Sequence, residues 1–181
     1  MKRILFLLVL LVAFASHAQE SVAQKYFSGL PLTDQDGNRV ILGELMKGRT
    51  VVVYSFFAQC AASCPMMAHS LTELQSRFAD RLGRDLWFVS ITVDPENDTP
   101  AKLKAYAARN MAKKGWSFLT GSREEVDAAL KKLAQWRPTR EDHMNLWIIG
   151  NDTTGLWMKA NGLAKANELG DIIQKVADDK K

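Results

Sequence analysis

Residues 50–65 read Thr50-Val51-Val52-Val53-Tyr54-Ser55-Phe56-Phe57-Ala58-Gln59-Cys60-Ala61-Ala62-Ser63-Cys64-Pro65. The run from Thr50 to Phe57 is almost continuously β-branched or aromatic, which predicts a strand covered on both faces. Beyond Pro65 the apolar residues recur every three or four positions, which predicts an amphipathic helix; they are Met67, Leu71, Leu74, Phe78 and Leu82. The chain's two cysteines, Cys60 and Cys64, therefore lie where a buried strand gives way to a helix.

Strand and helix patterns alternate along the rest of the chain. An N-terminal hairpin is expected within residues 30–42, and further strands at 86–93, 116–120, 146–149 and 156–159. Helices are expected around Leu103 to Met111, after the capping-box pair Ser122 and Glu125, and around Leu169 to Val176. Asp94 and Asp98, in the break after the 86–93 strand, are explained most simply by strand termination and helix capping. The order predicts an α/β fold, thioredoxin-like, with a central mixed sheet, helices on both faces and the added N-terminal hairpin.

The cysteine spacing narrows the chemistry without deciding it. A helix start stabilises thiolates, which both disulfide exchange and soft-metal binding require. Three residues separate Cys60 from Cys64, and on a helix such a pair has Cβ atoms about 5–6 Å apart. A disulfide needs about 3.5–4.5 Å, whereas a copper(I) ion bridging two sulfurs fits the wider gap. The spacing favours a metal, and reversible oxidation stays open.

A third ligand would have to come from elsewhere in the chain. His69 lies five positions beyond Cys64 in the helical pattern, so it is expected to point away from both thiols. His143 lies in a polar loop before the 146–149 strand, and in a thioredoxin-like sheet that loop faces the start of the cysteine helix. By position alone, His143 is either a ligand or a solvated loop residue.

The N-terminus has the three parts of a secretory signal. The basic leader Met1-Lys2-Arg3 precedes the apolar run of residues 4–15, and small residues around Ala18 offer a cleavage site. The sequence therefore predicts a signal peptide at 1–18, a single domain at 19–181 and export to an oxidising space, the bacterial periplasm. An uncleaved membrane anchor through residues 4–15 is the alternative. Basic and acidic residues are interspersed and the formal net charge is only +4, so nucleic acid is not expected as a partner.

Four motifs in order resemble the Sco/SenC family. They are the Cys60-x-x-x-Cys64-Pro65 motif, the run from Val89 to Pro100, the Gly115 to Gly121 segment, and Asp142-His143 before a strand. The resemblance extends from about residue 30 to residue 176. It implies copper bound by Cys60, Cys64 and His143, and a role in assembling the dinuclear copper site of cytochrome c oxidase. Ala58, where the family often has threonine, and Ser63, where it often has an aliphatic residue, depart from the pattern.

Three functions follow from these patterns. The favoured one is a metallochaperone that holds copper, as Cu(I) or Cu(II), and passes it to a client protein such as an oxidase subunit. The alternative is a thiol–disulfide oxidoreductase in which Cys60 and Cys64 form a reversible disulfide. It is disfavoured because thioredoxin-like oxidoreductases usually carry a cis-proline just before the final strand pair, facing their active cysteines. Here the nearest proline, Pro138, lies five residues before His143. A thiol peroxidase is placed last, because Ala58 stands where such sites have threonine.

Overall fold

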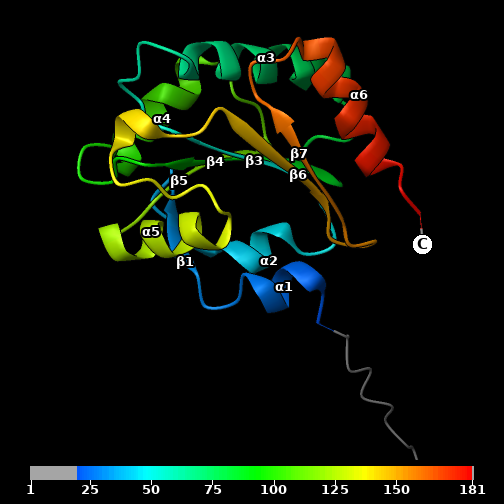
Figure 1. Cartoon of the computed structure of the whole chain (residues 1–181), viewed down its shortest axis with the longest axis horizontal. Coiled ribbons are helices and arrows are strands. Elements are labelled where there is room, and N and C mark those ends of the chain that lie inside the picture. Colours follow the sequence, from blue (N-terminus) through cyan, green and yellow to red (C-terminus); the bar gives the residue numbers. More distant parts are fainter. Residues whose placement is uncertain (1–19, 181) are drawn as a thin grey trace, which may run out of the picture.

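The computed structural model describes residues 20–180, which form one seven-stranded mixed sheet between two layers of helices (Figure 1). The sheet order is β2-β1-β5-β4-β3-β6-β7. The strands are β1 (Pro31–Asp34), β2 (Arg39–Ile41), β3 (Thr50–Phe56), β4 (Leu86–Thr92), β5 (Trp116–Thr120), β6 (Leu146–Asn151) and β7 (Leu156–Asn161). The three central strands β5, β4 and β3 are parallel, and the outer pairings are antiparallel. The thioredoxin-like mixed sheet is confirmed.

Helices cover both faces of the sheet. In Figure 1, α3 (Cys64–Arg77), α4 (Pro100–Arg109) and α6 (Ala166–Ala177) lie above it, whereas α1 (Val22–Tyr26), α2 (Leu42–Met46) and α5 (Arg123–Lys132) lie below. Each layer has its own apolar core, since alternate side chains of β3 point to opposite faces. Val52 and Tyr54 join the core beneath α3, and Val51 and Val53 join the core over α5. Burial on both faces explains the unbroken apolar pattern of β3.

Strand register brings three distant segments to one edge of the sheet. In the parallel pair of β3 and β4, Phe56 lies opposite Thr92, so the two strands end together. Strand β6 is antiparallel to β3, with Trp147 opposite Tyr54, so it begins at the edge where β3 ends. The residues after β3, after β4 and before β6 therefore meet at this edge.

Several expected boundaries differ from the structure. The 30–42 hairpin is confirmed as β1 and β2, but α1 and α2 have only five residues each and left no periodic signal in the sequence. Helix α3 ends at Arg77, and Leu82, expected on that helix, instead forms an isolated bridge with Leu86. Met111 likewise lies beyond the end of α4, with a positive φ of 50°.

The expected signal peptide at 1–18, with its apolar run at 4–15, lies outside the described residues. Within residues 20–180, the helices are too short and too polar for any of them to cross a bilayer. Cleavage and export stay predictions.

Gly115, just before β5, lies very close to the backbone of Gly83, just before β4, and this close packing can be tested by mutation. Gly115 has a φ of +96°, and a Cβ there would overlap the backbone nitrogen of Gly83. Gly37 has a similar φ of +85° but open space around it. We expect Gly37→Ala to cost about 1–2 kcal/mol of unfolding free energy from backbone strain alone, and Gly115→Ala to cost about 1–3 kcal/mol more because backbone must move. Urea denaturation of both variants measures the difference; equal losses would contradict the close packing.

Candidate metal site

The segment that joins β3 to α3 places the two cysteines differently. Cys64 is the first residue of α3, followed by Pro65 in the first turn. Cys60 lies before the helix, in a turn closed by its own N–H, which donates to the carbonyl of Phe57 at 3.1 Å. The expectation that both thiols lie on one helical face is therefore wrong. The tight turn after β3 brings Cys60 back over the start of the helix, so the spacing of an ideal helix does not apply to the pair.

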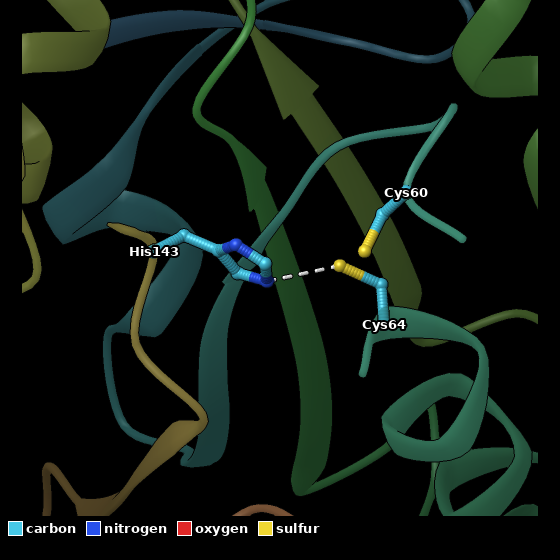
Figure 2. A group of neighbouring side chains, drawn as sticks. All are labelled: Cys60, Cys64 and His143. Atoms are coloured by element: carbon cyan, nitrogen blue, oxygen red, sulfur yellow. Dashed lines mark hydrogen bonds between the residues drawn. The ribbon is translucent and has the colours of Figure 1, made fainter. Parts of the chain in front are cut away.

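Three side chains meet at this edge of the sheet. The two sulfurs of Cys60 and Cys64 and a ring nitrogen of His143 all lie within 4.8 Å of one another (Figure 2). The Cys64 sulfur is 3.1 Å from His143 Nε2, and both cysteines are free thiols. Among residues 20–180, no other group of three or more His, Cys, Asp or Glu side chains could hold a metal ion. The structure thus brings together all three predicted ligands, and their ligand role stays a prediction.

Backbone and ring contacts orient the imidazole of His143. It follows the short 3-10 turn Arg140–Asp142, and its Nδ1 lies 3.0 Å from the carbonyl oxygen of Arg140. A carbonyl can only accept a hydrogen bond, so Nδ1 carries the proton and Nε2 presents its lone pair to Cys64. The ring also packs edge-to-face on Phe57, with centroids 5.4 Å apart. Burial lowers the pKa of His143, so the imidazole stays neutral, as metal binding requires.

The Cys64 thiol is buried, with 1% of the residue exposed. Burial raises the pKa of Cys64 well above its ordinary range, and the neighbouring Cys60 raises it further. The raised pKa contradicts the expectation that the helix start stabilises a thiolate at Cys64, because desolvation outweighs the backbone hydrogen bonds that lower the pKa. Without a metal, Cys64 is a neutral thiol that can donate to the free Nε2 of His143.

Two buried carboxylates, whose role the sequence analysis missed, hold the loops that carry these ligands. Asp98 accepts the N–H of Ala58 at 2.9 Å, two residues before Cys60. Asp94 pairs with Arg140 at 2.6 Å, and the carbonyl of Arg140 in turn orients His143. Burial raises the pKa of Asp98, and its hydrogen bonds from Thr92 and Ala58 oppose that rise. The helix cap itself is Thr99, not Asp98. Their position in the sequence could have indicated this role, because residues that follow neighbouring parallel strands lie at the same edge of the sheet.

The other histidine of these segments and two of their methionines have partners of their own. His69 is exposed and pairs with Glu73 at 3.1 Å, which confirms that it points away from the thiols. Met67 is fully buried in the core, and the Met144 sulfur accepts a hydrogen bond from Arg137. Asp142, beside His143, accepts from the hydroxyl of Thr139 and does not orient the imidazole.

The donor set has a clear chemical preference. Two thiol sulfurs and one neutral imidazole nitrogen suit a soft transition metal, and copper(I) above the hard cations that prefer oxygen. Cys64 is enclosed, whereas Cys60 and His143 are both half-buried. Such a site can hold a soft metal while Cys60 and His143 stay partly accessible from solvent.

Comparisons with known proteins give one consistent family. The SCO1/SenC family model matches residues 17–148. The SCO1 protein homolog of Bacillus subtilis is 36% identical over 153 residues, covering 79% of this chain and 77% of that protein. The solved structure of BsSco, described as a member of the Sco family of cytochrome c oxidase assembly proteins with a disulfide switch, is 28% identical, with a TM-score of 0.67 over 83% of this chain and 92% of that chain. Yeast Sco1 with copper bound shares the fold, with a TM-score of 0.71 at 23% identity over 84% of this chain and 88% of that one.

The different environments of the two thiols predict selective alkylation. In reduced, metal-free protein we expect iodoacetamide to modify Cys60 at least about tenfold faster than Cys64, because the reagent needs an accessible thiolate and burial disfavours the Cys64 thiolate. Mass spectrometry of the two cysteine positions over time measures both rates. The same reaction in urea serves as the control and should remove most of the difference. Faster modification of Cys64 in the folded protein would contradict its placement.

Proposed function

The chain belongs to the SCO1/SenC family, and from this premise we propose that it is a copper metallochaperone that holds its cargo with Cys60, Cys64 and His143. The observation that carries the proposal is the convergence of the three ligand atoms within 4.8 Å. His143 lies 79 residues beyond Cys64 in sequence and further still from Cys60, so the meeting of the three side chains is a property of the fold.

The local chemistry supports copper(I) as the cargo. Thiolate sulfur and imidazole nitrogen are preferred ligands of this ion. The Nδ1 hydrogen bond to Arg140 leaves the lone pair of His143 Nε2 free for the metal. Binding would also remove the protons of Cys60 and Cys64, because the thiolate is the ligand form. Since Cys60 is half-buried, a client thiol can approach on its side and take the copper by ligand exchange.

The place of action and the client are part of the proposal. The basic leader, the apolar run 4–15 and the small residues before Gln19 support export to a bacterial periplasm, with release after Ala18. The client would be a copper-receiving protein, in line with BsSco's description as a member of a family of cytochrome c oxidase assembly proteins. An oxidase subunit with a dinuclear copper site fits this role.

Thiol–disulfide exchange is the second candidate, favoured by the facing thiols of Figure 2. The half-buried Cys60 would attack a client disulfide as the thiolate, forming a mixed disulfide and releasing one client thiol. Cys64 would then attack the Cys60 sulfur, releasing the second client thiol and leaving a Cys60–Cys64 disulfide. The client gains two electrons and the cysteine pair loses two.

Copper(I) affinity tests the proposal directly. Reduced protein is titrated anaerobically against a chromophoric copper(I) chelator. We expect Cys60→Ser with Cys64→Ser to abolish tight binding, and His143→Ala to weaken it at least about tenfold, equivalent to ~1.4 kcal/mol. His69→Ala is the matched control, because His69 is exposed and distant from the thiols, and it should bind as the wild type does.

The same variants separate the two candidates. An unchanged affinity in His143→Ala, together with rapid reduction of a client disulfide by the wild type, would reject the chaperone and leave the oxidoreductase.

A further inference from the structure

A continuous series of hydrogen bonds connects the cysteine loop to the histidine loop. The Ala58 N–H donates to Asp98 Oδ2 at 2.9 Å, and the Thr92 hydroxyl donates to the same oxygen at 2.6 Å. That hydroxyl also accepts the N–H of Asp94 at 2.9 Å. The Asp94 carboxylate then accepts from Arg140 at 2.6 Å, and the Arg140 carbonyl accepts from His143 Nδ1 at 3.0 Å.

The Thr92 hydroxyl is the junction of this series. It contacts both aspartates, as donor to the Asp98 side chain and as acceptor from the Asp94 backbone, and it lies beside a direct backbone bond in which the Asp98 N–H donates to the Asp94 carbonyl at 2.9 Å. Thr92 is fully buried, and Asp98 and Asp94 are 1% and 5% exposed, so water cannot easily replace these bonds. A buried donor or acceptor that loses its partner is costly, which holds this part of the series to one arrangement, whereas the Arg140 side chain is partly exposed.

We propose that Thr92 and Asp98 are positioning residues that couple the two loops, so that the sulfur and imidazole ligands are set at their common site before a metal arrives. The inference rests on the proposed function of that site. It assigns a task to Thr92, the last residue of β4, and to Asp98, neither of which touches the ligand atoms.

Fixing the loops in advance matters because the ligands lie on separate segments. Cys60 is in an irregular turn and His143 follows a single 3-10 turn, so neither is held by a long helix or strand. Without the connection, each loop would have to be ordered at the expense of binding free energy when the metal binds. Because β4 is a central strand of the sheet, hydrogen bonds to its last residue order both loops when the protein folds, before any metal binds.

Three variants isolate the hydroxyl of Thr92. Thr92→Val keeps the branched shape and removes the hydroxyl, whereas Thr92→Ser keeps the hydroxyl and serves as the conservative rescue. Thr120→Val is the matched control, because Thr120 is also a buried strand residue, 4% exposed, and its hydroxyl has no hydrogen-bond partner within residues 20–180.

The first measurement uses metal-free, reduced protein and nuclear magnetic resonance. In Thr92→Val we expect Ala58 amide exchange to accelerate at least about tenfold relative to the core amide of Val52. We also expect the nitrogen chemical shifts of the His143 ring to depart from those of a single Nδ1–H tautomer. Thr92→Ser and Thr120→Val should resemble the wild type at both positions. A change at Ala58 with His143 unaltered would overturn the coupling, as would equal acceleration at Val52, which indicates a general loss of stability.

The second measurement is a double-mutant cycle on copper(I) affinity. We expect Thr92→Val to weaken binding about tenfold in the wild-type background and only about threefold in His143→Ala, where the histidine end no longer contributes. Effects that multiply independently would overturn the coupling. If the wild type itself shows no copper(I) binding that depends on Cys60 and Cys64, the proposed function fails, while the metal-free experiment still decides the coupling.

Discussion

The parallel pairing of β3 with β4 is the constraint on which the rest of the site depends. With Phe56 opposite Thr92, both strands end at the same level, and the chain after each strand must turn at one edge. One turn carries Cys60, and the other carries Asp98, which accepts the Ala58 N–H, and Asp94, which pairs with Arg140. Strand β6 begins at that edge because it is antiparallel to β3, and this delivers His143. Register alone thus gathers residues that are far apart in the sequence.

Burial has a second effect on the site: it disfavours charge on two of the three predicted ligands, the buried Cys64 and the half-buried His143. Cys64 is kept as a thiol and His143 as a neutral imidazole, both because desolvation penalises the charged forms. A soft cation reverses this balance, since it stabilises the thiolate that burial disfavours. If the site binds copper as proposed, metal uptake releases protons, and exchange can start on the side of the half-buried Cys60.

Much of the fold could be predicted from local sequence patterns, because several strands and helices carry patterns that extend over many residues. The unbroken apolar run of β3, the period of α3 and the β1–β2 hairpin were all readable, and the Cys60, Cys64 and His143 set followed from the family resemblance. Most of the missed features depend on contacts between distant segments. The burial that keeps Cys64 protonated and the aspartate contacts depend on how distant segments pack together, which no local spacing encodes. The turn that takes Cys60 off the helix is local, but no periodic pattern marks it.

X-ray absorption at the copper edge of the copper(I)-loaded protein tests the central claim most directly, because it counts the atoms around the metal. The convergence of Cys60, Cys64 and His143 predicts two sulfur scatterers and one imidazole nitrogen in the wild type. In His143→Ala the nitrogen should disappear while both sulfurs remain. A wild-type spectrum with sulfur alone, or one that His143→Ala leaves unchanged, would contradict the account.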